Sequence, residues 1–336
     1  MKIIIPLAGY GTRMRPHTWS RPKALLHVAG NTVIGHLLNL MSEITGRDDS
    51  QVIFVVGYKG DEIEAWIRER YPQLNLHFVV QEEALGQAHA LWLCRDFMAE
   101  DELLIAFGDG IVDAEYADIP EPDVDGVCLV QAVEDPSKFG VVAVDENGFI
   151  TDFIEKPATM EHKLAIAGIY WFRHGRQLRQ ALDTVISEER QTKGEYYLAD
   201  AYEVLLEQGA RIVTKPTIFW LDAGNPENVL HTNARLLSLG YGTQDIIERS
   251  YAEEFTVLPP VFLHRSAVVD SSVIGPYASI EAGVTVKDAI VRNSIIDAGA
   301  HVELCILDGA LIGENTRVTG KSTKLFIGDD SLVELD

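Results

Sequence analysis

The C-terminal part of the chain repeats branched apolar residues at a six-residue spacing, and this feature limits the fold more than any other. Ile274, Ile280 and Val286 begin the pattern. The same spacing continues, with interruptions, at Ile290, Ile296, Val302, Ile312, Val318, Ile327 and Val333. Such a period is typical of a parallel β-helix, in which each short strand stacks on its counterpart one coil away. We therefore expect about four coils over residues 268–335, in preference to an antiparallel sandwich.

The first 240 residues instead alternate short β-branched runs with helical patterns, which is typical of a mostly parallel sheet covered by helices. The expected strands are 2–7, 51–56, 75–80, 102–107 and 218–221, and the expected helices are 33–45, 61–70, 86–98, 177–188, 199–208 and 226–239. Consecutive strands fill 126–172, with a hairpin turn at 145–148. We expect an α/β fold with a doubly wound, Rossmann-like sheet over residues 1–240, a linker at 241–262 and the β-helix over 263–336.

The charge of the chain limits its partners. The 336 residues include 28 Lys and Arg against 51 Asp and Glu, a net charge of −23. Such an acidic surface repels nucleic acids and anionic lipids. Any phosphate ligand must therefore be held by a few local cations. The scattered cysteines Cys94, Cys128 and Cys305 form no disulfide framework, and the apolar runs are far shorter than the roughly 20 residues that span a bilayer. We expect a cytoplasmic protein without nucleic-acid or membrane partners.

The first predicted strand runs directly into a glycine-containing loop with adjacent cations. Gly9 and Gly11 allow backbone N–H groups to approach an anion closely. Arg13 adds a forked positive charge, and Lys23 adds a point charge. A dinucleotide-binding pattern would need glycine at position 14, where the chain has Met14. The loop therefore favours phosphate binding and disfavours a dehydrogenase.

The series Gly9, Gly11, Thr12, Arg13, then Pro16, Thr18, Pro22 and Lys23, resembles the signature of the sugar-1-phosphate nucleotidylyltransferases. The resemblance is to the long forms, which carry a left-handed β-helix after the catalytic domain, and above all to the glucose-1-phosphate thymidylyltransferases. It implies an enzyme that makes an NDP-sugar and pyrophosphate from a nucleoside triphosphate, dTTP first and UTP next, and a sugar-1-phosphate, first glucose-1-phosphate. The nucleotide-binding set that it implies is Leu7, Ala8, Gly9, Gly11, Thr12, Arg13, Gln81 and Gly86.

Two acidic residues follow predicted strands and are candidates for holding a metal. In this reaction a sugar-phosphate oxygen attacks the α-phosphorus, which requires charge neutralisation and in-line positioning rather than a protein nucleophile. Mg²⁺ prefers carboxylate and phosphate oxygens. The resemblance assigns Mg²⁺ to Asp109 and Asp222, and it implies catalytic roles for these acids together with Arg13 and Lys23. Taken singly, Asp109 also fits a turn cap, and Asp222 fits an N-cap of the next helix.

Base recognition in the family uses a glutamine followed five residues later by a glycine, a spacing that Gln81 and Gly86 reproduce. A glutamine amide offers both a donor and an acceptor, which suits the edge shared by thymine and uracil. The alternative for Gln81 is a solvated loop residue.

The resemblance also implies a sugar-phosphate subsite. Its members are Gly140, Glu155, Lys156, Ile166, Gly168, Tyr170 and Lys193, with Glu155 accepting sugar hydroxyls and the lysines contacting phosphate. The chain departs from the family in three places. Gly110 follows Asp109 where many relatives have Asn or Asp, Lys193 replaces an arginine, and Phe139 replaces a tyrosine. These departures leave the sugar open.

Other functions are compatible with parts of the sequence. A non-catalytic regulatory subunit could bind a nucleotide-sugar and assemble through its β-helix, but it would not need Lys23, Asp109 and Asp222 together. A glycosyltransferase would carry a D-x-D motif, which residues 109–111 lack. Acyltransfer by the β-helix is disfavoured, because His264 and His301 are the only histidines in that region and no long inserted loop accompanies them. We expect the β-helix to assemble a homo-oligomer.

Overall fold

The computed structural model describes residues 1–191, 194–253, 255–320 and 325–335. Its contacts divide the chain into two compact units. The first, here called the sheet unit, comprises residues 1–10 and 36–220. The second, the β-helix unit, comprises residues 11–35 and 221–336, so it contains the segment after the first glycine of the N-terminal loop. The predicted domain boundaries at residues 240 and 262 stay a prediction.

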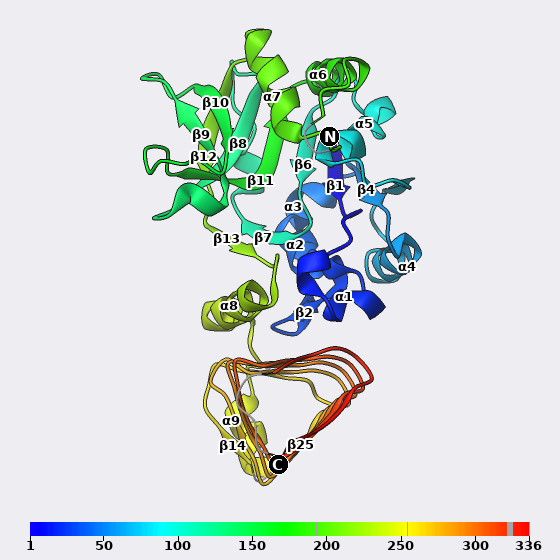
Figure 1. Ribbon diagram of the computed structural model, residues 1–336, viewed down its shortest axis with the longest axis vertical. Helices are drawn as coiled ribbons and strands as arrows, with labels where there is room; N and C mark the ends of the chain where they lie inside the picture. The colour runs from blue at the N-terminus through cyan, green and yellow to red at the C-terminus, as the bar shows by residue number, and fades with distance from the viewer. Residues whose placement is uncertain (192–193, 254, 321–324, 336) are drawn as a thin grey trace. The chain divides into compact units, whose positions relative to one another are not determined.

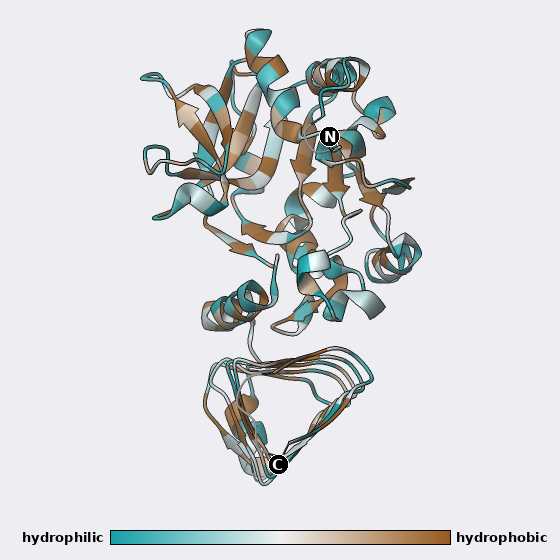
Figure 2. Ribbon diagram, in the orientation of Figure 1, coloured by the Kyte–Doolittle hydropathy of each residue, from teal (hydrophilic) through white to brown (hydrophobic). Residues whose placement is uncertain are grey.

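Four parallel strands form the first half of the main sheet. β1 (Lys2–Pro6) lies between β4 (Gln51–Val56) and β6 (Leu103–Ala106), and β5 (Leu76–Val80) lies beyond β4. β1, β4 and β6 are mostly buried apolar runs, as expected for parallel strands inside a sheet covered by helices, whereas the edge strand β5 is only partly buried (Figure 2). Because the strands are parallel, the loops after β1, β4 and β6 all leave at the same edge.

Mostly antiparallel strands form the other half of this sheet. β11 (Leu164–Phe172) runs antiparallel to β6 and joins the two halves. β8 (Gly126–Ala132), β9 (Gly140–Val144) and β10 (Ile150–Glu155) continue the antiparallel pairing, and β12 (Ile212–Pro216) is parallel to β8. The sheet is therefore mixed, with the predicted hairpin between β9 and β10, and the Rossmann-like α/β fold is confirmed (Figure 1).

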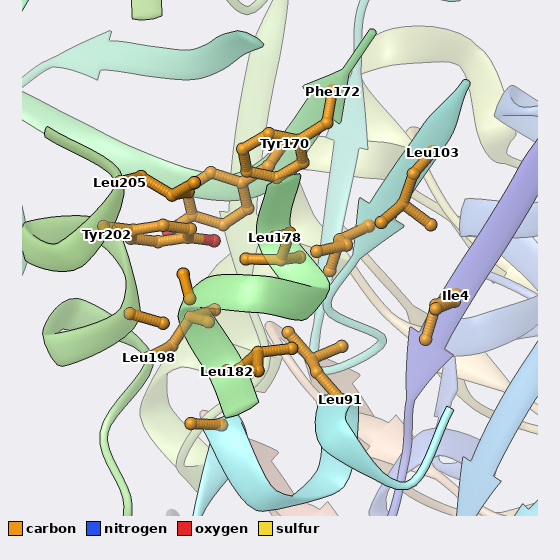
Figure 3. Packing of buried hydrophobic residues seen from close by; sticks show 14 of the residues in the cluster. Ile4, Leu91, Leu103, Tyr170, Phe172, Leu178, Leu182, Leu198, Tyr202 and Leu205 are labelled. Carbon is orange, nitrogen blue, oxygen red and sulfur yellow. The ribbon is translucent and has the colours of Figure 1, made fainter. Parts of the chain in front are cut away.

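Helices cover this sheet, and their side chains build its core. The helices numbered from α2 to α7 are α2 (Val33–Leu40), α3 (Ser42–Thr45), α4 (Gly60–Arg70), α5 (Gln87–Trp92), α6 (Gly175–Ser187) and α7 (Leu198–Glu207). Tyr202 of α7 packs against Tyr170 of β11 with ring centroids 4.7 Å apart, beside Leu178 and Leu182 of α6 (Figure 3). Within the described ranges, no helix is long and apolar enough to cross a membrane.

Two predicted helices are shorter than expected. The predicted helix 33–45 is divided into α2 and α3 at Met41, and the predicted helix 86–98 ends as α5 at Trp92 and continues as a 3-10 turn at Arg95–Phe97.

β7 (Gly110–Asp113) and β13 (Phe219–Asp222) pair as a separate two-stranded sheet.

The β-helix unit stacks its short strands into three parallel sheets, one on each side of a triangular coil (Figure 1). These strands are β14 (Thr256–Val257), β15 (Phe262–Leu263), β16 (Val268–Asp270), β17 (Val273–Ile274), β18 (Ser279–Ile280), β19 (Thr285–Lys287), β20 (Ile290–Arg292), β21 (Ile295–Ile296), β22 (His301–Glu303), β23 (Ile306–Asp308), β24 (Leu311–Ile312), β25 (Arg317–Gly320), β26 (Phe326–Ile327) and β27 (Leu332–Leu335). The predicted parallel β-helix is confirmed.

The remaining elements of this unit are helices and a hairpin. They are α1 (His17–Ser20), β2 (His27–Val28), β3 (Asn31–Thr32), α8 (Pro226–Leu236) and α9 (Ile246–Ala252). The segment expected to be a linker, 241–262, contains α9 and the first β-helix strand, β14. The coils therefore begin earlier in the chain than the repeat pattern indicates.

The inward-facing positions differ from a strict six-residue repeat. Ile280 pairs with Ile296, and Ile296 with Ile312, so these two coils advance by sixteen residues on this face. After Val286, the next buried branched side chain is Val291, whereas Ile290 is 37% exposed. The six-residue spacing predicted at Ile290 therefore does not mark an inward position, because the inward side chains after Val286 are Val291 and Ile296, five residues apart.

This register makes opposite predictions for two isoleucines in the same coil. Ile296→Asn should lower the free energy of unfolding by about 3 kcal/mol or more, because it places an amide among buried apolar side chains. Ile290→Asn should change it by less than about 1 kcal/mol. Urea unfolding of both variants measures the difference, and equal losses would contradict the register.

Candidate active site

Close packing joins the ends of β1 and β6 in the sheet unit. A Cβ atom at Gly108, the second residue after β6, would lie 2.1 Å from the end of the Leu7 side chain after β1, so the two loops are in contact and a larger residue at position 108 would displace Leu7. Asp109 follows at once and is exposed. Gly57 after β4 is similarly confined, because a Cβ there would lie 2.9 Å from the Ala8 carbonyl oxygen. Neither Gly57 nor Gly108 was predicted to be a functional residue. The sequence signal that could have indicated them is a glycine shortly after a buried strand.

The predicted base-binding pair is brought into direct contact. Gln81 follows β5, is 7% exposed, and donates from Nε2 to the Gly86 carbonyl oxygen at 3.1 Å. Gly86 has a φ of 101°, and a Cβ there would lie 2.5 Å from the Tyr196 carbonyl oxygen. Only glycine fits this backbone and this space. Gln81 is therefore a fixed, buried side chain rather than a solvated loop residue.

The predicted sugar residues lie on adjacent strands, β9, β10 and β11. Gly140 pairs with Glu155, and a Cβ at Gly140 would lie 3.1 Å from Glu155 Oε2 and 3.5 Å from the Ile166 side chain. The backbone N–H of Lys156 donates to the Phe139 carbonyl oxygen at 3.0 Å, and its Nζ lies 3.5 Å from Glu155 Oε1. These contacts bring Gly140, Glu155, Lys156 and Ile166 together.

Gly168 connects β11, which carries predicted sugar-binding residues, to β6, which precedes Asp109. It has a φ of 79° and accepts a hydrogen bond from the Phe107 N–H at 3.0 Å. The pairing of β11 with β8 shifts register between Ile166 and Tyr170, which surrounds this glycine with a bulge.

Two members of the predicted sugar set differ from the rest. Tyr170 is 7% exposed and belongs to the core, where its ring packs against Tyr202. The structure therefore gives Tyr170 a packing role. Lys193 lies outside the described residues.

The rest of the phosphate loop belongs to the β-helix unit. Gly11 has a φ of 61°, and a Cβ there would lie 3.1 Å from the Thr18 side chain and 3.2 Å from Lys23 Cβ. Thr18 donates from its hydroxyl to the Gly11 carbonyl oxygen at 2.8 Å. Thr12 and Arg13 then form an exposed 3-10 turn. This tight turn holds Arg13 and Lys23 in one short region of the chain.

Asp222 is held firmly at the end of β13. Its Oδ1 accepts from the Gly224 N–H at 2.9 Å, and its Oδ2 accepts from the side-chain amide of Asn228. The N-cap of α8 is Asn225, whose Oδ1 accepts from the Asn228 N–H at 2.9 Å. Asp222 is therefore not the N-cap of that helix.

The chemistry of these donors fits a hard cation. With one hydrogen bond on each oxygen, Asp222 keeps lone pairs for Mg²⁺, and an exposed carboxylate at Asp109 is the other ligand type that Mg²⁺ prefers. Asp109 belongs to the sheet unit and Asp222 to the β-helix unit. Their convergence on one metal stays a prediction.

Comparison with known proteins places the chain in a family. A family model for nucleotidyl transferases matches residues 2–238, which is more than half of the chain. The chain belongs to the nucleotidyl transferase family. Together with its curated relatives, this makes it a sugar-1-phosphate nucleotidyltransferase.

The relatives of this nucleotidyl transferase differ in substrate. It is 28% identical to a glucose-1-phosphate thymidylyltransferase of Streptomyces griseus, over 100% of this chain and 99% of that protein. It is 27% identical to the low-salt glycan biosynthesis nucleotidyltransferase Agl11 of Haloferax volcanii, over 100% of both. It is 30% identical to the mannose-1-phosphate guanylyltransferase catalytic subunit beta of Drosophila melanogaster, over 68% of this chain and 61% of that protein.

A solved structure shows a similar fold. It is provisionally assigned as a glucose-1-phosphate thymidylyltransferase from Bacillus anthracis and contains sucrose. It matches this nucleotidyl transferase with a TM-score of 0.59 and 26% identity, over 70% of this chain and 94% of that one.

Within the β-helix unit, a buried ionic cluster ties the segment after the phosphate loop of the nucleotidyl transferase to the coils. Arg21 donates to Asp297 Oδ2 at 2.7 Å and also pairs with Glu314. His27 Nδ1 lies 3.1 Å from Asp297 Oδ1. Burial raises the pKa of Asp297, but the hydrogen bond from His27 and the charge of Arg21 outweigh it and hold that pKa below its usual range.

Glu281 belongs to the same cluster, but its carboxylate lacks a full set of hydrogen bonds. It is 5% exposed, and no described residue hydrogen-bonds its Oε1. Burial raises the pKa of Glu281 from 4.5 to about 7, although His27 and Arg21 lower it in part. Above that pH the nucleotidyl transferase must bury a poorly solvated carboxylate.

The shifted pKa of Glu281 predicts a pH-dependent gain of stability. Between its ordinary value and about 7, the folded chain keeps a proton that the unfolded chain releases, so stability falls as pH rises through this window. Glu281→Gln should therefore raise the free energy of unfolding by up to about 3 kcal/mol at pH 8 and change it little at pH 4.5.

The matched control is Asp297→Asn. It should destabilise the protein by about the same amount throughout pH 4.5 to 8, because Arg21 loses one of its two charged partners and Asp297, whose pKa is held below its usual range, is ionised over this whole window. Thermal unfolding from pH 4.5 to 8 measures both variants. A gain for Glu281→Gln of the same size across this range would contradict a titrating Glu281.

Proposed function

We propose that this protein is a Mg²⁺-dependent nucleotidylyltransferase that makes an NDP-sugar and pyrophosphate, with dTTP favoured, UTP next, and glucose-1-phosphate as the sugar substrate. The observation that carries the proposal is the hydrogen bond from Phe107 to Gly168 combined with the packing of Gly108 on Leu7. Together they connect the sugar strand, the loop of Asp109 and the start of the nucleotide loop in the sheet unit. The full-length likeness to the Streptomyces griseus enzyme supports the choice of dTTP and glucose-1-phosphate.

Each residue set has a distinct task in this reaction. Arg13 and Lys23 neutralise the triphosphate and stabilise the charge that develops on the leaving pyrophosphate. Gln81 reads the base beside Gly86. Asp109 and Asp222 would hold Mg²⁺, which supplies further charge neutralisation and orients the phosphate oxygens.

The sugar phosphate supplies the nucleophile, so the protein has to position it rather than react with it. Gly140 lets the sugar approach β9, Glu155 accepts hydrogen bonds from its hydroxyls, and Ile166 lines the same face. Lys156 and Lys193 would contact the sugar phosphate. The attacking oxygen then lies in line with the bond from the α-phosphorus to pyrophosphate.

The proposal includes the cellular location of the enzyme and its assembly. The acidic composition and unpaired cysteines support a cytoplasmic enzyme without nucleic-acid partners. Exposed apolar residues on the coils, such as Val268 and Ile306, support homo-oligomerisation through the β-helix.

Replacing the first acid tests the chemistry. Asp109→Ala should lower turnover by about two orders of magnitude or more while the protein stays folded, because the metal and its substrate oxygens lose a ligand. Pyrophosphate release over a grid of nucleoside triphosphates and sugar-1-phosphates, with and without Mg²⁺, measures the effect and identifies the substrates.

The control is Asp96→Ala, which removes an exposed acid after α5 and should leave turnover unchanged. Wild-type turnover in Asp109→Ala would remove this residue from the mechanism. Nucleotide-sugar binding by the wild-type protein without turnover of any substrate pair would favour a regulatory subunit instead.

A further inference from the structure

The amide of Gln81 is oriented by two groups of its own chain. The Gly86 carbonyl oxygen lies 3.1 Å from Nε2 and can only accept, so the amide nitrogen must be on that side. His89 Nδ1 lies 3.1 Å from the same Nε2. With both amide hydrogens directed at acceptors, His89 Nδ1 must carry no proton, and the proton of the neutral ring is on Nε2.

The other half of the amide is available for a ligand. Among the described residues, no donor reaches Oε1 of Gln81, which keeps its acceptor capacity. An oxygen in this state pairs with a ring N–H and opposes a ring nitrogen that carries a lone pair. The orientation of one buried side chain thus determines which base edge fits.

His89 is held in place by aromatic packing on α5 and beside it. Its ring lies nearly parallel to Trp92, with centroids 6.1 Å apart, and to Tyr196, at 6.4 Å. Trp92 is itself held by Asp183 of α6, which accepts from its indole N–H at 2.9 Å, and by Arg95, which lies over its ring at 4.0 Å. His89 therefore has little freedom to turn Nδ1 away from Gln81.

We infer that His89 is a positioning residue for base selection, holding Gln81 so that its Oε1 accepts the N3–H of thymine or uracil and rejects the N3 lone pair of cytosine. The inference rests on the proposed role of Gln81 in nucleotide binding. It does not separate dTTP from UTP, because these bases share that edge. The selectivity is set by a histidine that never touches the substrate.

The same geometry makes nucleotide affinity depend on pH. Burial lowers the pKa of His89 below its ordinary value of 6.5, and the nearby Glu83 opposes this only in part, so the ring is neutral at pH 7. Protonation converts Nδ1 into a donor that faces another donor. Gln81 cannot simply reverse, because its oxygen would then face the Gly86 carbonyl oxygen.

The test compares His89→Leu with His89→Asn in the full-length protein with Mg²⁺. Asn places its Oδ1 where the acceptor Nδ1 lies, whereas Leu supplies no acceptor. The control is His231→Asn, an exposed histidine on α8. The KM and kcat for dTTP, UTP and CTP are measured with one sugar-1-phosphate from about pH 8 down to the lowest pH at which the protein stays folded, and dissociation constants of the three nucleotides are measured by calorimetry.

We expect His89→Leu to lower the preference for dTTP and UTP over CTP about tenfold or more, in KM and in the dissociation constant rather than in kcat. His89→Asn should keep most of the preference and lose the weakening of binding in acid that the wild-type protein shows. His231→Asn should match the wild type in both respects.

Three results would overturn the inference. They are an unchanged preference in His89→Leu, a loss of kcat that is equal for all three nucleotides, and the same acid weakening in His89→Asn as in the wild type. Preferential binding of dTTP and UTP without turnover would support the inference while contradicting the proposed catalysis. No binding of any nucleotide by the wild-type protein would contradict both.

Discussion

The contact between the loops that follow β1 and β6 is the interaction on which the predicted site in the sheet unit depends. β1 is hydrogen-bonded directly to β6 in parallel, so the two strands end at one edge, where Gly108 packs against Leu7 just before Asp109. Phe107 then binds Gly168, which brings β11 and its neighbours to the same place. Strands far apart in the sequence thus bring the start of the predicted nucleotide loop, Asp109 and the predicted sugar-binding residues together in the sheet unit.

The residues of this site that form local sequence motifs could be predicted. The contacts between residues distant in the sequence could not. Gln81 and Gly86 are five residues apart, so a motif finds them, and the strand before Asp109 is an evident apolar run. The hydrogen bond between Gln81 and His89 requires the first turn of α5 and the packing of Tyr196, which no local pattern specifies. The position of Asp222 relative to helix α8 was ambiguous, because an acid shortly before a helix is also a common N-cap.

The β-helix shows how periodicity predicts an architecture but misplaces its register. Apolar branched residues spaced by about six indicate stacked coils, which the structure confirms. Yet Ile290 and Val291 are adjacent and chemically alike, so composition cannot decide which faces inward. The choice follows from stacking, because Val291 must lie over Ile274 and under Leu307 for the coils to pair. A five-residue side is therefore visible only once all coils are assembled.

The ionic cluster of the β-helix unit lies close in the chain to Arg13 and Lys23, the predicted catalytic cations. Arg21 and Asp297 are 276 positions apart, and Arg21 lies only two residues before Lys23. Buried ion pairs add little net stability, because desolvation offsets their attraction, but breaking one leaves an uncompensated charge and is costly. The cluster is therefore better suited to fixing how residues 11–35 lie on the coils than to stabilising them. The coils themselves contain no predicted substrate-binding residue. Through Arg21, they nevertheless help to fix the segment that carries Arg13 and Lys23.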